Sequence, residues 1–254
     1  MSKEGGDNMK SITQEELDGM IEKHKLWLEK KEGGKKLELC NVQLLNLILH
    51  NVDLSYSSFF NVDMFSVNII HCNLHNSLLH NVYIDGTLIH GTNLSTSNLY
   101  NLEFDGITIV DTNLTCSNLY KTKFSHCKLT NVCLKDVILN KILFKNNSID
   151  TTLAESAKFE NVLLIDNTLD DKVIQIGPIG SRKDYTLYFA DKDNVRCGCW
   201  KDYKGSTLEE FEKAVKEKYP DGEYHDEYMM VIETFKKSKE LYLKSKKETD
   251  KNEV

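Results

Sequence analysis

An elongated β-solenoid with helical covers at both ends is the fold that the sequence predicts, and two regularities predict it. The first is a frame of five residues: between Leu39 and Leu169, 26 of the 27 positions with numbers ending in 4 or 9 are Leu, Ile, Phe or Met, and the exception is Ala154. The second is a set of side-chain ladders that recur every 20 residues. A helix repeats every 3.6 residues and a strand every 2, so a period of five requires a corner in every repeat.

The frame also indicates how the interior is filled. The position two residues before each centre is Val, Ser, Thr, Cys or Ala in 20 of 26 cases from Val42 to Asn167, so a large and a small side chain alternate inside. Ladders at 20-residue spacing indicate four repeats in each coil, with serines inside, polar side chains beside the centres and phenylalanines at the centres: Ser57, Ser77, Ser97 and Ser117; Asp53, Asn73, Asn93 and Asn113; Phe104, Phe124 and Phe144.

Single repeats show a recurring pattern of a small residue, Asn or Asp, Leu and two variable residues. It is almost unchanged in Cys72-Asn73-Leu74, Thr92-Asn93-Leu94, Thr112-Asn113-Leu114 and Val52-Asp53-Leu54. The pattern resembles the pentapeptide-repeat family. The resemblance implies a right-handed, four-sided β-helix, and the frame predicts about seven such coils over residues 37–170. Because each coil of a solenoid contacts only its neighbours, both ends need covers.

The first cover is expected within residues 1–36, which form an N-terminal arm and a capping helix. Thr13-x-x-Glu16 is a capping box, the usual signature of a helix start. Leu17, Met20, Ile21 and Trp27/Leu28 then fall on one helical face until Gly33-Gly34 stops the helix. That face should shield the first coil.

The second cover is expected in residues 171–244, as a ββαα module followed by a charged tail over 245–254. A turn at Lys192-Asp193-Asn194 predicts a hairpin of residues 185–191 and 195–200, and Thr207-x-x-Glu210 predicts a helix that Pro220-Asp221-Gly222 ends. Three segments resemble a C-terminal module of phage and bacterial pentapeptide-repeat proteins: Ile179-Gly180-Ser181-Arg182, Cys197-Gly198-Cys199-Trp200 and Gly205-Ser206-Thr207-Leu208-Glu209-Glu210-Phe211. That resemblance implies no function.

Composition excludes several classes of protein. No stretch approaches the roughly 20 apolar residues of a membrane span, and the N-terminal residues 1–8 lack the apolar segment of a signal peptide. The net charge is −7 and only two basic residues are Arg, the preferred reader of phosphates and guanines, so direct binding of nucleic acid is not expected. Seven cysteines, an odd number, indicate a reducing compartment, and we expect a cytoplasmic protein.

Catalytic, metal and cofactor sites are not predicted, because a narrow filled rod has no cleft in which reacting groups converge. Five histidines crowd one half of the frame, but at outward positions that the frame assigns to different coils and faces: His50, His71, His75, His80 and His90. They are interpreted as solvated. In the C-terminal module, Cys197 and Cys199 alternate on one predicted strand and form at best half of a metal site. With Arg182 and Trp200 they are the candidates for a small-ligand site.

Charge along the frame is the most informative functional signal. No Lys or Arg occurs from Leu37 to Tyr120, against seven acidic residues. Four of the acidic residues flank centres of a single side: Asp63, Asp85, Glu103 and Asp105. Aromatic residues follow the centres of the neighbouring side at 20-residue spacing and should point outward in one stack: Phe60, His80, Tyr100 and Tyr120. Exposed aromatic side chains bordered by carboxylates are typical of a protein interface, although such a stack can also simply shield a β-helix face.

Three functional hypotheses follow. The first is a non-enzymatic scaffold that presents this acidic, aromatic-edged surface to a protein partner. Within it, the family resemblance implies an alternative in which the rod imitates duplex DNA and modulates a type II topoisomerase or another DNA-binding protein. The second is an assembly protein that forms a homodimer through its C-terminal helices. The third is a small-ligand site in the C-terminal module, with the rod as a spacer.

Overall fold

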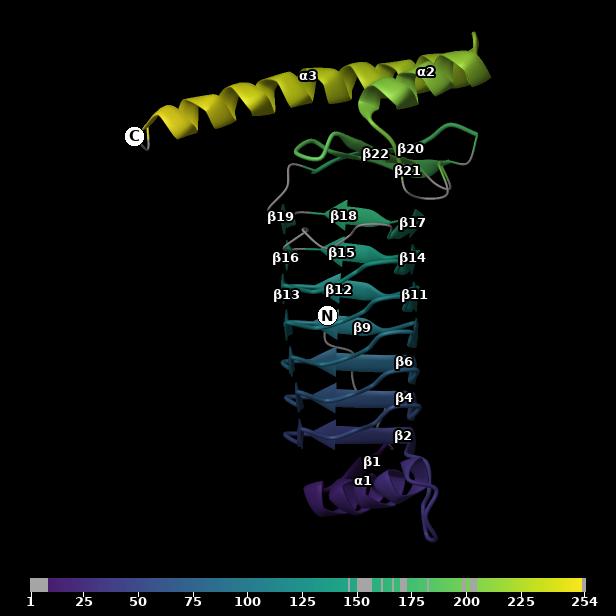
Figure 1. Ribbon diagram of the computed structural model, residues 1–254, viewed down its shortest axis with the longest axis vertical. Coiled ribbons are helices and arrows are strands. Elements are labelled where there is room, and N and C mark those ends of the chain that lie inside the picture. The colour runs from purple at the N-terminus through teal and green to yellow at the C-terminus, as the bar shows by residue number, and fades with distance from the viewer. Residues whose placement is uncertain are drawn as a thin grey trace.

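The structure, a computed structural model, is a four-sided β-solenoid with a helix beneath it and a mixed β and α module above it (Figure 1). It describes residues 9–145, 147–149, 157–160, 162–165, 167–169, 173–181, 183–197, 200–201 and 205–252. The predicted fold class, a pentapeptide-type solenoid with α caps, is confirmed.

Parallel strands stack along the solenoid axis and form its sides. Three early strands run along the first side, turn the corner and continue on the second side: β2 (Glu38–Leu45), β4 (Ser58–Phe65) and β6 (Leu78–Asp85). Later strands continue the first side as β8 (Asn98–Tyr100), β11 (Asn118–Tyr120), β14 (Ile138–Asn140) and β17 (Lys158–Glu160). The second side continues as β9 (Glu103–Asp105), β12 (Lys123–Ser125), β15 (Leu143–Lys145) and β18 (Leu163–Ile165).

The third and fourth sides differ in regularity. The third side is a ladder of β3 (Ile48–His50), β5 (Asn68–Ile70), β7 (Leu88–His90), β10 (Thr108–Val110), β13 (Lys128–Thr130), β16 (Ser148–Ile149) and β19 (Thr168–Leu169). The fourth side consists of single bridges that link Asp53, Asn73, Asn93, Asn113 and Cys133. All four sides are therefore described for five coils, and strands β14 to β19 add two further layers on three sides.

Left-handed backbone at the corners explains the period of five. Nearly every fifth residue has a φ between 49° and 66°, beginning with Asn41, Asn46, Asn51, Tyr56 and Asn61. Asn tolerates this conformation better than most residues because its short side chain bonds locally. Gly86, Gly91 and Gly106 occupy three further corners, and glycine adopts left-handed backbone at the lowest energetic cost of any residue.

The core has the composition that the frame predicts. Every centre residue from Leu39 to Leu129 is buried, and Phe104, Phe124 and Phe144 stack in register with ring centroids 4.7 and 4.9 Å apart. The predicted serine ladder is buried as well: Ser57, Ser77, Ser97 and Ser117. Beside the fourth-side centres, Asn73 donates to Asp53 and Asn93 donates to Asn73, each at 3.0 Å. Sequence position alone thus predicted which side chains point inward.

The N-terminal cover contains a strand and a helix. Strand β1 (Lys10–Ile12), which the sequence analysis did not predict, pairs in parallel with Val42–Leu44 and covers the free edge of β2. Helix α1 (Gln14–Leu28) starts with the predicted capping box, and Leu17 is buried against the first coil. The helix ends at Leu28, five residues before Gly33, so Trp27 lies half-exposed at its end instead of beneath the coil.

His24 is the polar contact that joins this cover to the coil. Its side chain is fully buried; the Leu37 N–H donates to Nδ1 (3.0 Å), which leaves Nε2–H to donate to the Ser55 carbonyl (3.1 Å). Burial lowers the pKa of His24 below 6.5, so the ring is neutral.

The C-terminal module has one strand more than predicted. An antiparallel sheet of β20 (Val173–Ile179), β21 (Asp184–Phe189) and β22 (Asn194–Cys197) packs under α2 (Leu208–Lys218) and α3 (Glu223–Asn252). The predicted hairpin corresponds to β21 and β22. Helix α3 also continues through residues 245–252, which the sequence analysis assigned to a separate tail.

Two side chains of the C-terminal module form hydrogen bonds with backbone groups in the last layer of the solenoid. The Leu164 N–H donates to Gln175 Oε1 at 2.9 Å, and Gln175 Nε2 donates to the Val162 carbonyl. The side-chain amide of Gln175 thus makes the hydrogen bonds that a neighbouring strand would otherwise make. The Arg196 guanidinium donates to the Ala157 carbonyl at 3.1 Å. Within the described residues, no helix is both long and apolar enough to cross a membrane.

Candidate functional site

The outward aromatic residues of the first side form a continuous column. Phe60, His80, Tyr100 and Tyr120 occupy equivalent positions of β4, β6, β8 and β11. Phe60 and His80 stack with centroids 4.7 Å apart, and the following ring pairs are 6.5 and 5.8 Å apart. Asn118 Nδ2 donates to the Tyr100 hydroxyl at 3.0 Å. We call these four residues the aromatic column.

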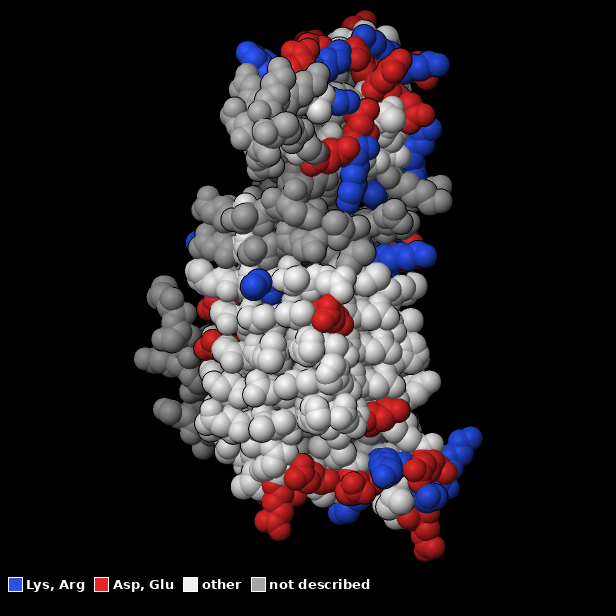
Figure 2. All heavy atoms as spheres, turned by 60° about the vertical axis from the view of Figure 1, so that its left-hand side comes forward, with Lys and Arg blue, Asp and Glu red and all other residues white. Residues whose placement is uncertain are grey.

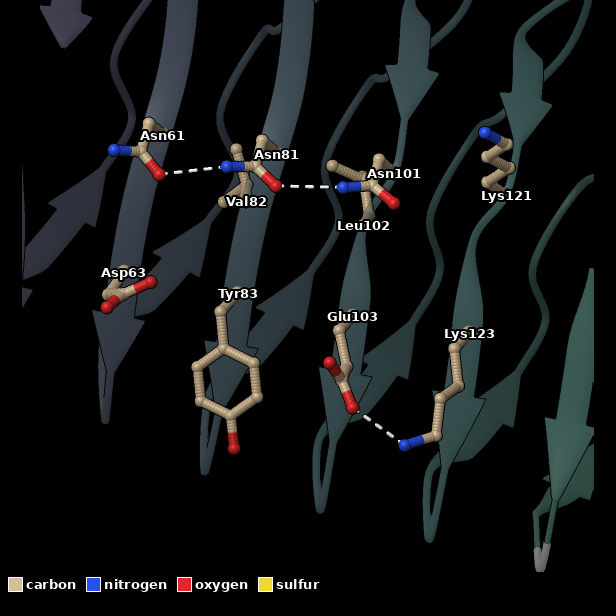
Figure 3. Close-up of a pocket in the computed structure, with 10 residues that line it drawn as sticks. All are labelled: Asn61, Asp63, Asn81, Val82, Tyr83, Asn101, Leu102, Glu103, Lys121 and Lys123. Atoms are coloured by element: carbon tan, nitrogen blue, oxygen red, sulfur yellow. Dashed lines mark hydrogen bonds and ion pairs between the residues drawn. The ribbon is translucent and has the colours of Figure 1, made fainter. Parts of the chain in front are cut away.

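The four carboxylates lie around the corner on the second side, and we call them the acidic row. Asp63 and Glu103 share one register line with Tyr83 between them, and Asp85 and Asp105 are direct neighbours on the next line. Because β4 and β6 run unbroken around the corner, Phe60 and Asp63 belong to one strand. Figure 3 shows Asp63, Tyr83, Glu103 and Lys123 side by side on successive strands.

An asparagine ladder at the corner separates the aromatic column from the acidic row. Asn61, Asn81 and Asn101 each donate to the asparagine of the preceding coil, at 2.6 to 2.8 Å, starting from Asn41 (Figure 3). A groove of about 230 Å³ lies beside this ladder, with Tyr83 and Lys123 in its wall. Neither this ladder nor Tyr83 was predicted from the sequence. The signal for the asparagine ladder was present, since its four asparagines recur at the same 20-residue spacing as the ladders that were predicted.

Two carboxylates of the acidic row have partners on the next strand and its corner. Lys123 Nζ lies 2.7 Å from Glu103, and His126 Nδ1 lies 2.8 Å from Asp105. Burial and the neighbouring carboxylates Asp85, Asp105 and Glu103 raise the pKa of Tyr83 to about 12, so its hydroxyl stays protonated at neutral pH. On the side seen in Figure 2, the middle of the solenoid carries only scattered acidic residues on a largely uncharged surface.

Three of the histidines are closer together than the frame suggested. His50 and His71 have ring centroids 6.1 Å apart, and His71 and His90 5.0 Å, along the corner after the third side. The interpretation that they lie on separate faces is therefore wrong, because the left-handed corner turns His71 toward its neighbours. His90 Nε2 lies 3.2 Å from Asp111. Within the described part of the chain, no group of three or more His, Cys, Asp or Glu side chains is arranged to hold a metal ion.

The C-terminal candidates are only partly described. Arg182 and Cys199 lie outside the described residues. Cys197 ends β22 and accepts a hydrogen bond from Thr186 Oγ1 at 3.4 Å, and Trp200 follows it with its Nε1 donating to Ser206 Oγ at 2.9 Å.

Comparison with known protein families agrees with the geometry of the coils. Residues 103–140 match the family model of pentapeptide repeats, in eight copies. Residues 103–140 therefore carry pentapeptide repeats. The matched segment lies within β9 to β14, and the same five-residue frame and left-handed corners extend to the first coil, so the pentapeptide repeats continue outside the matched range.

The solved structures that match this chain have low sequence identity to it. A trypsin-treated variant of QnrB1, a plasmid-mediated fluoroquinolone resistance protein, is 14% identical over 49% of this chain and 74% of its own, with a TM-score of 0.39. Rfr23 from the cyanobacterium Cyanothece is 16% identical over 61% of this chain and 95% of its own (TM-score 0.30). HetL from the cyanobacterium Nostoc is 11% identical over 57% and 92% (TM-score 0.24). No curated protein sequence matches the chain.

Proposed function

We propose that this protein is a non-enzymatic scaffold that binds a protein partner through the aromatic column and the acidic row. The observation that carries the proposal is the exposure of the column at its N-terminal end: Phe60 is 48% exposed although it stacks on His80, and Leu78 on the neighbouring strand β6 is 39% exposed. Aromatic side chains that are already ordered lose little conformational entropy on binding and are enriched in binding hot spots.

The chemistry of this surface defines the partner. Apolar and aromatic area lies on one side of the corner, hydrogen-bonding amides follow the corner, and carboxylates line the other side. A matching partner presents an apolar pocket bordered by Lys or Arg. The carboxylates would then speed association and orient the encounter, while the aromatic rings would supply most of the affinity.

The test is to recover the partner from the source cell with the wild-type chain and then to compare variants at equal concentrations of folded protein. Phe60→Ala is expected to weaken binding at least about tenfold, which corresponds to about 1.4 kcal/mol. Tyr56→Ala is the matched control, because Tyr56 is also a 48% exposed aromatic residue of the same coil but lies at the opposite edge of the first side. Equal loss of binding in both variants, or in neither, would contradict the proposal.

A second set of variants separates steering from contact. Asp63→Asn, Glu103→Gln and Asp105→Asn together should lower the association rate and leave the dissociation rate nearly unchanged. The wild-type association rate should also fall as salt is raised. A dissociation rate that changes while the association rate does not would show that these carboxylates do not act as steering charges.

Imitation of duplex DNA, directed at a type II topoisomerase or another DNA-binding protein, is the second candidate. The lack of Lys and Arg from Leu37 to Tyr120 favours it. The local pairing of Glu103 and Asp105 with Lys123 and His126 weakens it, since duplex DNA carries one charge per about 1.7 Å. A DNA mimic should compete with duplex DNA for the topoisomerase, and this competition should weaken steeply as salt is raised. A scaffold for another protein should not compete with DNA for the topoisomerase.

Homodimerisation through α3 and a cytoplasmic location complete the proposal. Met230 and Leu241 are each 62% exposed and lie 11 residues apart on α3, about three helical turns, so they share one stripe. Sedimentation of the wild type and of a Met230→Glu, Leu241→Glu variant tests the dimer, because only the wild type should sediment as two copies. Fractionation of the source cell tests the location.

A further inference from the structure

The three C-terminal segments that the proposed function does not use meet around one pocket. Ser181 follows β20, Cys197 ends β22, Trp200 follows β22, and Phe211 lies on α2. Together with Tyr219 and Tyr228 they line a pocket of about 180 Å³ in the C-terminal module. Residues up to 47 positions apart in the sequence therefore line one site, which is separate from the aromatic column and the acidic row.

Aromatic rings in mutual contact form the floor and walls of this pocket. Trp200 meets Phe211 edge to face at 5.8 Å between centroids, and Phe211 meets Tyr228 in the same way at 6.1 Å. Tyr219 stacks on Tyr228 at 5.7 Å. Phe211 and Tyr228 are buried, whereas Trp200 and Tyr219 are half-buried. A ligand ring could therefore contact Trp200 and Tyr219 without unfolding the core.

Gly180 shows how closely this pocket is built. Its φ is +67°, and a Cβ at this position would lie 2.0 Å from the Tyr228 hydroxyl. The Gly180 N–H also donates to Glu227 Oε2 at 2.8 Å. The strand end is thus held against α3 by a contact that only glycine permits, and this contact places Ser181 at the pocket, 3.3 Å from the Tyr219 hydroxyl.

The rim of the pocket is basic. Lys218 Nζ lies 5.3 Å from the centre of the Tyr219 ring, and Lys201 Nζ lies 5.8 Å from the centre of the Trp200 ring. None of the described residues that line the pocket is acidic. The hydroxyls of Ser181 and Tyr219 are hydrogen-bonded to each other, which leaves one of their two O–H groups to donate to a ligand. Such a rim favours an anionic group and disfavours a cation.

We propose that this pocket binds a small planar aromatic anion, a single ring that carries a carboxylate or a phosphate. The ring lies against Trp200 and Tyr219, and the anionic group meets Lys201, Lys218 and the Ser181 hydroxyl. Apolar walls with a few polar groups at one end are typical of small-molecule sites. The proposal is independent of the protein-binding surface on the solenoid, which lies on different strands.

Tryptophan fluorescence of the full chain tests this site directly, because the chain has only two Trp residues. In a Trp27→Phe background, all Trp emission comes from Trp200. Titration with benzoate and with phenyl phosphate should give saturable changes in emission, and the two probes distinguish a carboxylate from a phosphate ligand. Inorganic phosphate and cyclohexanecarboxylate should give no saturable change at the same concentrations, since each lacks the aromatic ring.

Variants of α2 assign the binding to the pocket. Lys218→Gln and Tyr219→Leu should each weaken binding of the aromatic anion at least tenfold. Lys213→Gln is the matched control, because Lys213 is an exposed lysine of the same helix that does not line the pocket. The Lys213→Gln variant should bind the aromatic anion as the wild type does. Saturation-transfer NMR on the wild-type chain gives the same answer if Trp27→Phe disturbs the N-terminal cover. Lack of saturable binding of both aromatic probes, equal binding of cyclohexanecarboxylate, or equal losses with Lys213→Gln would overturn the proposal.

Discussion

Replacement of Phe124 by Ala gives the most direct test of the five-residue frame. Phe124 is 2% exposed and stacks on Phe104 at 4.7 Å and on Phe144 at 4.9 Å. Removal of a buried Phe side chain costs about 3–5 kcal/mol in unfolding free energy. Each aromatic pair contributes about 0.5–1.5 kcal/mol beyond its buried area. Since two pairs are lost in the middle of the column, we expect a loss near the upper end, about 4–5 kcal/mol.

Urea unfolding followed by circular dichroism measures this loss. With a slope of about 2 kcal/mol per M, within the usual range for urea, the unfolding midpoint should fall by about 2 M. Phe60→Ala is the control, because Phe60 also belongs to a stacked column but is 48% exposed, and it should cost less than about 1 kcal/mol. If the two variants lose similar stability, the assignment of inward and outward positions is refuted.

Three further predictions concern the N-terminal cover and the buried thiols. Deletion of residues 1–34 removes β1 and α1, exposes the edge of β2 and should produce soluble oligomers or aggregates in size-exclusion chromatography. As the pH falls below 6.5, the unfolded chain takes up a proton on His24 before the folded chain does, so the unfolding free energy should decrease between pH 7.5 and 5.5 by more in the wild type than in His24→Gln. Burial raises the pKa of the Cys127 thiol to about 11, so a thiol reagent at pH 8 should label the exposed Cys40 and Cys116 quickly and Cys127 only on unfolding.

Specific outcomes would contradict these three predictions. A monomeric deletion variant that melts like the full chain would mean that the cover is dispensable. An equal pH dependence in the wild type and in His24→Gln would mean that the His24 ring is not held neutral between Leu37 and Ser55. Labelling of Cys127 at the rate of Cys40 in the folded protein would mean that the interior of the solenoid is open to reagents.

The coils could be predicted from the sequence because every pentapeptide repeats the same arrangement of side chains and the same backbone corner. A large residue and a small residue face inward, and the corner residue, which is Asn or Gly at 11 of the 21 corners from Asn41 to Lys141, accepts left-handed backbone. Neighbouring coils are identical in register, so a spacing of 20 residues converts directly into contact, as in the Phe104–Phe124 stack and the Asn73–Asp53 hydrogen bond. The positions of the aromatic column and the acidic row follow from the same rule.

The contacts between residues that are not 20 positions apart could be identified only from the tertiary structure. The pairing of β1 with β2 and the burial of His24 between α1 and the first coil join segments without a fixed spacing, and so do the Gln175 and Arg196 contacts with the last layer. The convergence of Ser181, Trp200 and Tyr219 on one pocket is of the same kind. Sequence periodicity by itself determined the solenoid, its interior and its two outward ladders, because each coil repeats the contacts of the one before. Only the tertiary structure decided how the ends are closed and where the C-terminal pocket lies, because these contacts depend on how non-repeating segments pack in three dimensions.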